Sequence, residues 1–266
     1  MKKKTKGIII GLLIVLILVI LISASKLLSI SHDYRVARRT YEKISNDYVT
    51  PSEQKTDPES GGGPAAQGES GVVLDSDRSP IEVDFDALLA QSRNVVGWLY
   101  SPDTVINYPV ARAEDNDYYL HRLFDGTANP SGTLFLDYRC SRDFSDRNTI
   151  IYGHHMNDGT MLASIVDYGK PGYYEEHPFL YLNTPDGNYR IDVFSGFITA
   201  SDSTAFTLDL AEDDAFTLYV DKMKRFSDFQ TEIEVGLEDK LVTLVTCTYE
   251  YTEARFVLVG KLVPIH

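Results

Sequence analysis

A cysteine and an arginine near the C-terminus have a spacing that could support nucleophilic catalysis. Cys247 ends one apolar run and Arg255 begins the next, with a short polar connection between them. Two such runs predict an antiparallel hairpin, in which paired positions have Cβ atoms about 5 Å apart. A guanidinium beside a thiol favours the thiolate and supplies fixed donors where negative charge develops. The spacing alone is equally compatible with a buried, inert cysteine and a surface arginine, since free cysteine is among the most buried residue types.

Two adjacent histidines form the second group that could do chemistry. His154 and His155 directly follow the apolar run 150–152 and Gly153. A histidine at a strand end can act as general acid or base near neutral pH. Adjacent side chains on an extended chain point to opposite faces and the other histidines are scattered, so the pattern does not favour a metal site. We interpret His155 as a structural residue.

Short β-like runs alternate with turn signals over the C-terminal two thirds of the chain. Residues 185–188 (Pro-Asp-Gly-Asn) are a good hairpin signal between two apolar runs. Amphipathic helices are predicted over 84–92 and 211–226. About eight strands at this spacing predict a mainly β fold, a closed barrel with a few peripheral helices. The predicted strands are 97–100, 105–110, 133–137, 148–152, 179–183, 189–198, 240–246 and 256–263.

An uncharged segment near the N-terminus predicts a transmembrane anchor. Residues 7–25 are rich in Ile, Leu and Val and follow a basic tail at 1–6. At about 1.5 Å per residue, this segment nearly matches a hydrocarbon core of about 30 Å. A cleaved signal peptide is the alternative, with Ser23-Ala24-Ser25 as a weak cleavage site, but its apolar region is usually shorter. The clustered N-terminal lysines favour a cytoplasmic N-terminus.

Two further segments separate this anchor from the predicted barrel. Residues 26–46 are mostly good helix formers and are predicted to form a juxtamembrane spacer helix. Residues 47–80 hold many Gly, Ser, Glu and Asp residues and few apolar ones, which predicts a flexible linker. The compact domain is then predicted over 81–266.

Charge and cysteine content exclude some classes of protein. Residues 1–45 carry nine Lys and Arg against two acidic residues, a net charge of +7, and the remainder carries −21. A domain that acidic repels phosphates, so nucleic-acid binding is excluded. The chain has two cysteines, too few for a disulfide framework. We interpret the second of them, Cys140, as a structural residue or an incidental free thiol.

Several segments, in chain order, resemble one known family. Residues 243–247 (Thr-Leu-Val-Thr-Cys) resemble the TLxTC signature of sortases, which has an arginine at the spacing of Arg255. Residues 152–154 (Tyr-Gly-His) look like the segment that bears the catalytic histidine of sortases. Val245 departs from class B sortases, which commonly have Ser there. The resemblance covers about 85–265, and its further matching segments are 94–98, 106–110, 116–120 and 132–137. These segments, the single N-terminal anchor and the predicted late helix are similar to class B.

The resemblance implies a sortase-type β-barrel and a cysteine transpeptidase that needs no metal or organic cofactor. It implies that Cys247 is the nucleophile, His154 the proton-transfer partner and Arg255 the oxyanion stabiliser. The residues implied to line the peptide groove are Asn116, Leu120, Tyr152 and Val245.

The resemblance also implies partners and a location. The substrates would be exported proteins with a C-terminal sorting motif of the NPxTN or NPxTG type, cleaved after Thr. The acceptor would be an amine of the peptidoglycan precursor of a Gram-positive cell. The chain would be a single-pass cell-membrane protein with its catalytic domain outside. Two alternatives stay open: a cysteine hydrolase of the same fold, and a membrane-tethered binding domain without catalysis.

Overall fold

Eight strands form a closed barrel in the computed structural model, which describes residues 2–52, 78–248 and 252–265. Around the barrel the strands follow the order β10-β8-β7-β3-β4-β5-β6-β9, and β9 pairs with β10 to close it. The predicted closed barrel is confirmed, and the predicted strand ends differ from the observed ones by at most two residues. The strands are β3 (Val95–Tyr100), β4 (Asn107–Ala111), β5 (Leu134–Leu136), β6 (Asn148–Tyr152), β7 (Phe179–Thr184), β8 (Gly187–Ala200), β9 (Lys240–Cys247) and β10 (Ala254–Ile265).

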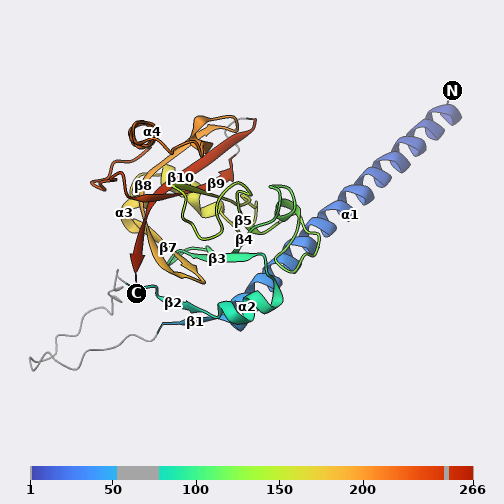
Figure 1. Ribbon diagram of the computed structural model, residues 1–266. Helices are drawn as coiled ribbons and strands as arrows, with labels where there is room; N and C mark the ends of the chain where they lie inside the picture. The colour runs from blue at the N-terminus through green and yellow to red at the C-terminus, as the bar shows by residue number, and fades with distance from the viewer. Residues whose placement is uncertain (1, 53–77, 249–251, 266) are drawn as a thin grey trace, which may run out of the picture.

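Two pairs in the barrel are parallel, namely β4 with β5 and β6 with β9, and the other pairs are antiparallel. Parallel neighbours need a crossover connection. The connection from β6 to β9 is long and contains β7, β8 and most of the short helices (Figure 1). The ends of β6 and β9 are therefore neighbours in the barrel, although they are far apart in the sequence.

Short helices and a two-stranded sheet surround the barrel. The amphipathic helix predicted late in the chain is present and buries one face, with Phe216 and Met223 against the barrel. The elements outside the barrel, apart from the N-terminal helix, are β1 (Val49–Pro51), β2 (Ile81–Val83), α2 (Phe85–Gln91), α3 (Tyr173–Glu176), α4 (Asp213–Phe226) and the 3-10 helices η1 (Tyr119–His121), η2 (Ala163–Gly169) and η3 (Thr204–Phe206).

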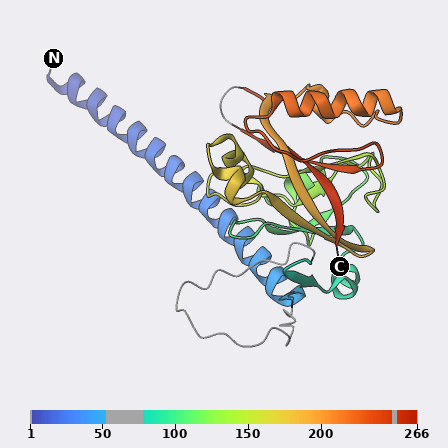
Figure 2. The ribbon, with the colours of Figure 1, turned by 90° about the vertical axis from the view of Figure 1, so that its left-hand side faces the viewer.

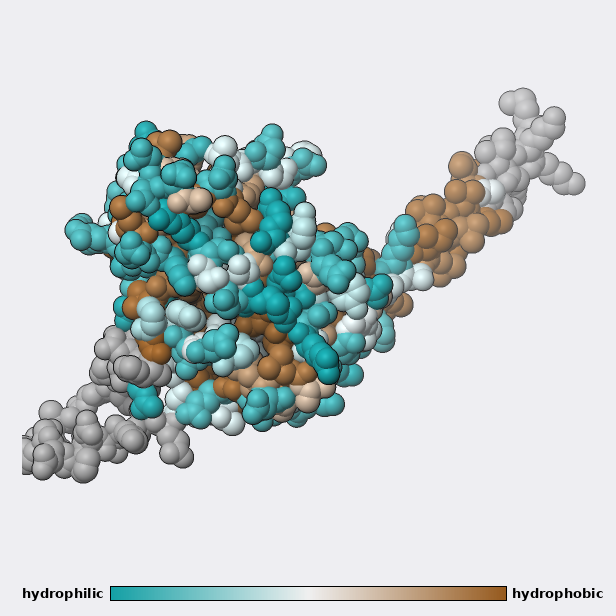
Figure 3. All heavy atoms as spheres, viewed as in Figure 1, coloured by the Kyte–Doolittle hydropathy of each residue, from teal (hydrophilic) through white to brown (hydrophobic). Residues whose placement is uncertain are grey.

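The N-terminal helix α1 (Lys2–Tyr48) runs without interruption from its free end to the barrel (Figures 1 and 2). Its apolar half, which includes Leu12 and Ile22, projects away from the barrel and is exposed (Figure 3). Within the described residues it is the one helix long and apolar enough to cross a membrane. A continuous apolar surface of this size needs a nonpolar environment to cover it.

The other end of α1 packs on the barrel. Ala37, Tyr41 and Ile44 are buried in the same core as the barrel strands, and β1 continues the chain into a pair with β2. The segment predicted as a spacer therefore has a packed face as well. Most of the predicted linker, residues 53–77, lies outside the described residues. The boundaries assigned to the tail, anchor, juxtamembrane helix and linker stay predictions.

Candidate active site

The parallel pairing of β6 with β9 brings the histidine segment beside the cysteine. Tyr152 pairs with Val245, and the next backbone amide, Gly153 N–H, donates to the Val245 carbonyl at 3.0 Å. His155 Nδ1 lies 3.1 Å from the carbonyl oxygen of Cys247. Parallel strands end at the same edge of a sheet, so His154 and Cys247 emerge together at one rim of the barrel.

The β9–β10 hairpin brings the arginine to the same rim. Arg255 pairs directly with Cys247 on one side and with Thr199 of β8 on the other. Directly paired positions have Cβ atoms about 5 Å apart. Among the described residues, the Arg255 guanidinium makes one hydrogen bond, from Nη1 to the Ala254 carbonyl at 3.0 Å. The other donors of its fork make no hydrogen bond to the described part of the chain.

All seven residues predicted for the site line a single cavity of about 550 Å³. This volume is in the usual range for a ligand site. The structure thus brings together the three predicted catalytic residues and the four predicted groove residues. The cavity walls also contain residues that were not predicted, namely Phe135, Arg139, Gly153, Ser201, Asp202, Ser203, Phe206 and Thr246.

The imidazole of His154 is oriented by a backbone carbonyl. Its Nε2 lies 2.8 Å from the carbonyl oxygen of Leu120. A carbonyl only accepts hydrogen bonds, so Nε2 carries the proton and Nδ1 is the nitrogen that can take up a second one. Burial lowers the pKa of His154, the hydrogen bond to Leu120 opposes this, and His121 adds to the lowering. A neutral ring at physiological pH is the state of a base that is ready to accept a proton.

A glycine before this histidine is required by packing. A Cβ on Gly153 would lie 2.4 Å from Leu134 Cδ2 and 2.7 Å from Leu162 Cγ. Both leucines are fully buried, so neither can move aside cheaply. The close approach sets the direction in which the chain leaves β6 and hence the place of His154.

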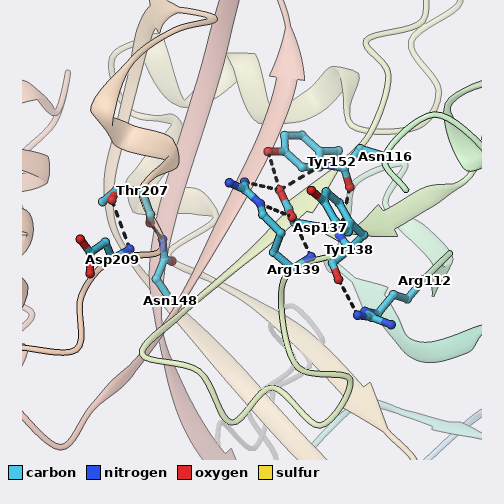
Figure 4. Close-up of polar contacts among 9 residues, drawn as sticks. All are labelled: Arg112, Asn116, Asp137, Tyr138, Arg139, Asn148, Tyr152, Thr207 and Asp209. Atoms are coloured by element: carbon cyan, nitrogen blue, oxygen red, sulfur yellow. Dashed lines mark hydrogen bonds and ion pairs between the residues drawn. The ribbon is translucent and has the colours of Figure 1, made fainter. Parts of the chain in front are cut away.

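A buried carboxylate supports one wall of the cavity (Figure 4). Asp137 is fully buried and accepts hydrogen bonds from the Arg139 guanidinium at 2.8 and 2.7 Å. Asn116 Nδ2 and the Tyr152 hydroxyl donate to the same carboxylate, each at 3.1 Å. Asn116 Oδ1 in turn accepts from the Tyr138 amide at 3.0 Å. Two predicted groove residues, Asn116 and Tyr152, are therefore held in place by Asp137.

Removing this carboxylate is expected to destabilise the fold. Asp137→Ala removes the shared acceptor of the hydrogen bonds from Arg139, Asn116 and Tyr152, so we expect a loss of about 3 kcal/mol in the free energy of unfolding. Urea denaturation of the wild type and the variant measures the difference. The control is Asp213→Ala, which breaks a more exposed Asp–Arg pair with Arg147 and is expected to lose about 1 kcal/mol or less. Equal losses in the two variants would contradict the structural role of Asp137.

The same carboxylate predicts a dependence of stability on pH. Burial acts to raise the pKa of Asp137, but the hydrogen bonds from Arg139 and Asn116 outweigh burial and hold the pKa below its usual range. A lowered pKa means that the stabilisation is fully present above the unfolded-state value of about 3.9 and is lost as the pH falls through the folded-state value. The stability difference between the wild type and Asp137→Ala should therefore shrink in acid.

Comparisons with known proteins agree with this geometry. A sortase-domain family model matches residues 99–263. Sortase B of Listeria monocytogenes is 36% identical over 174 residues, which are 65% of this chain and 71% of that protein. Sortase B of Staphylococcus aureus is 26% identical over 254 residues, 95% of each chain.

Comparison with solved structures indicates the same family. The Staphylococcus aureus sortase B–substrate complex superposes with a TM-score of 0.65 at 32% identity, over 68% of this chain and 85% of that one. A Bacillus anthracis sortase B in complex with AAEK1 gives a TM-score of 0.71 at 31% identity, over 88% and 100%. The chain belongs to the sortase family. More narrowly, it is a homologue of sortase B and hence a cysteine transpeptidase of class B.

Proposed function

We propose that this protein is a membrane-anchored sortase that cleaves NPxTN- or NPxTG-like sorting motifs of exported proteins after Thr. It then transfers the exported protein to an amine of the peptidoglycan precursor. The observation that carries the proposal is that Cys247, His154 and Arg255 line one cavity at one rim of the barrel. A nucleophile, a proton-transfer group and an anion-stabilising group are the three functions that acyl transfer requires.

In the first step, neutral His154 takes up the proton of the Cys247 thiol, and the resulting thiolate attacks the Thr carbonyl carbon and forms a C–S bond. The carbonyl oxygen becomes an oxyanion, which accepts hydrogen bonds from the Arg255 guanidinium. The intermediate collapses with cleavage of the peptide C–N bond, and His154 in its protonated form gives a proton to the departing amine. The product is a thioester on Cys247.

In the second step, an incoming amine replaces the thiolate. Its nitrogen attacks the thioester carbonyl while His154, now neutral, takes up the proton that the amine loses. The C–S bond breaks and Cys247 leaves as the thiolate. The thiolate then takes the proton back from His154, which returns the enzyme to its starting state, and the exported protein has gained an amide bond. Neither step needs an oxidant, a metal or an organic cofactor.

We propose that Asn116, Leu120, Tyr152 and Val245 contact the sorting peptide. Their position in the cavity supports this role. The amide of Asn116 is already bonded at both ends, to Asp137 and to the Tyr138 amide. Asn116 would therefore contribute to peptide binding chiefly as a fixed surface, whereas Val245 would contribute an apolar contact next to the nucleophile.

We propose that the apolar half of α1 is an uncleaved anchor with a cytoplasmic N-terminus and an external barrel. The continuity of α1 into the packed core supports an anchor over a cleaved signal peptide, because Ser23-Ala24-Ser25 lies inside an unbroken helix. An external domain also places the site on the side where exported proteins and the peptidoglycan precursor meet.

The test uses the full chain in detergent micelles with fluorogenic peptides that contain NPxTN or NPxTG, and with peptides of the same composition in scrambled order. We expect cleavage after Thr and a thioacyl adduct on Cys247, detected by mass spectrometry. Triglycine serves as one amine acceptor, since a sortase B of 32% identity has been solved in complex with triglycine. A transpeptidase then forms a new amide product with triglycine in place of the free acid.

The outcomes separate the candidate functions. Cleavage that yields only the free acid, whatever the amine, would favour a cysteine hydrolase. Absence of both cleavage and adduct with every peptide would overturn the proposed substrate class, and a tethered binding domain would become the leading explanation.

A further inference from the structure

The packed end of α1 contacts two segments that lie next to the His154 ring. One segment is 129–133, which lies against the carbonyl that orients the ring. The other is the loop 153–162, which begins at the end of β6 and carries His154 itself. Together these contacts connect the N-terminal helix to the active site.

The first contact is made by Tyr41, a buried residue of α1. Its hydroxyl donates to the Gly132 carbonyl and lies 3.0 Å from Thr133 Oγ1. Gly132 has φ of +59°, and a Cβ at this position would lie 2.8 Å from the Leu120 carbonyl oxygen and 3.2 Å from His154 Cδ2. The Leu120 carbonyl is the hydrogen-bond partner of His154 Nε2. One glycine therefore separates Tyr41 from both the imidazole and its orienting carbonyl.

The second contact is an ion pair to the loop that carries His154. Arg38 Nη2 lies 3.2 Å from Asp158 Oδ2. The other oxygen of Asp158 accepts a hydrogen bond from the Thr160 hydroxyl at 2.6 Å, and the Leu162 amide donates to the His154 carbonyl at 3.0 Å. The ion pair therefore connects α1 to the loop 153–162, whose two ends are joined by the backbone hydrogen bond between Leu162 and His154.

A third contact supports the same loop through an aromatic pair. The Tyr41 ring packs edge-on against Tyr108, with ring centroids 5.2 Å apart. The Tyr108 hydroxyl accepts a hydrogen bond from the Met161 amide at 3.2 Å. The C-terminal end of the loop 153–162 is therefore held by Tyr108, which packs against Tyr41.

We propose that α1 is a positioning element of the active site, in which Tyr41, supported by Arg38, fixes the orientation of the His154 ring. This inference rests on the proton-transfer role proposed for His154. Because α1 is one continuous helix (Figure 1), its apolar half and its packed face belong to a single rigid element. The geometry of the catalytic rim then depends on α1, the same helix that is proposed as the membrane anchor. A barrel without α1 loses this support.

The titration of His154 offers a readout that a merely structural role of Tyr41 would not change. Any shift must be judged against the other charged and titratable groups on the elements around the ring. These groups are His121 at η1, Arg139 beyond β5, His155 and Asp158 on the loop itself, Cys247 on β9, Arg255 on β10, Tyr108 on β4 and Arg38 on α1. None of them is changed in Tyr41→Phe, so a shift in that variant reports on the position and solvation of the ring.

The experiment compares Tyr41→Phe with Tyr48→Phe in the full chain in detergent micelles. Both substitutions remove one hydroxyl from α1, but the Tyr48 hydroxyl bonds to Gln91, away from the histidine segments. Isotope-labelled histidine gives the titration of His154 by NMR, and the signal missing from His154→Gln assigns it. Burial is the largest cause of the lowered pKa of His154, so a loosened ring in Tyr41→Phe should titrate closer to the ordinary value.

Kinetics provide the second readout. We expect kcat for peptide cleavage to fall roughly fivefold to tenfold in Tyr41→Phe with KM unchanged, because the peptide groove is intact while the proton-transfer group is misplaced. Tyr48→Phe should match the wild type in both readouts. If Tyr41→Phe also matches the wild type in the His154 titration and in kcat, the inference is overturned.

The two proposals fail in different ways. If the wild type cleaves no peptide, the proposed substrate class fails, but the His154 titration still tests the coupling to Tyr41. If the wild type cleaves and requires His154 while Tyr41→Phe changes nothing, only the coupling fails. Arg38→Gln provides a second variant at an exposed side chain, for the case in which Tyr41→Phe lowers the folded fraction. It removes a charge and is therefore judged by kcat, which should fall by a smaller factor than in Tyr41→Phe.

Discussion

Replacing Cys247 with alanine is expected to reduce peptide cleavage by about 10⁴-fold or more, because no other group at the rim can form the thioester. Cys247 stands at the end of β9, partly exposed to the cavity, with Arg255 paired beside it. Its removal leaves the barrel core unchanged, so the variant should fold as the wild type does. Peptide turnover and intact-protein mass spectrometry measure the loss of cleavage and of the adduct.

The chain supplies a matched control in its other cysteine. Cys140 is fully buried, and burial raises the pKa of its thiol to about 11, so it is protonated at neutral pH. Cys140→Ala should keep the cleavage activity, at a loss of about 1 kcal/mol of stability. In the folded wild type, a thiol-reactive label should modify Cys247 and spare Cys140. Labelling of Cys140 with retained activity in Cys247→Ala would reject Cys247 as the nucleophile.

The hairpin that pairs Cys247 with Arg255 could be predicted from spacing. Two apolar runs joined by a short polar segment have few ways to pair. The register of β9 with β10 places Cys247 opposite Arg255, as the spacing predicted. The place of His154 could not be derived in this way. It depends on the parallel pairing of β6 with β9 across a long connection, and only the family resemblance related this histidine to Cys247 before the register was known.

The hydrogen-bond network around Asp137 was not predicted, because a single sequence contains only a weak indication of it. Asp137 directly follows the short apolar strand β5, and Arg139 stands two residues further on. An acidic residue at the end of a strand usually indicates a turn. Its complete burial depends on Asn116 and Tyr152, which come from distant segments. Such a network forms only when the barrel closes, so local spacing does not reveal it.

The packed face of α1 could have been predicted from the spacing of its apolar residues. Ala37, Tyr41 and Ile44 follow helical spacing and predict one apolar face. An amphipathic segment next to an anchor is equally suited to the membrane surface, and its partner surface is made from several separate strands and loops. The sequence therefore predicted the helix but not the core that it joins.

Arg255→Ala is expected to lower kcat by about 10²- to 10³-fold, the usual loss when one oxyanion donor is removed. The thermal midpoint should change little, because the described hydrogen bond of this guanidinium goes only to the neighbouring Ala254 carbonyl. Steady-state kinetics with the sorting peptide that the wild type prefers give kcat and KM separately.

Arg255→Lys tests whether charge or geometry carries the effect. A lysine keeps the positive charge next to Cys247 but lacks the planar fork of donors, so we expect it to recover only a small part of kcat. Full recovery would mean that Arg255 acts through its positive charge next to Cys247 and not through the geometry of its donors. A rise in KM with unchanged kcat in either variant would instead assign Arg255 to peptide binding, because an oxyanion donor acts on the transition state and not on the bound substrate.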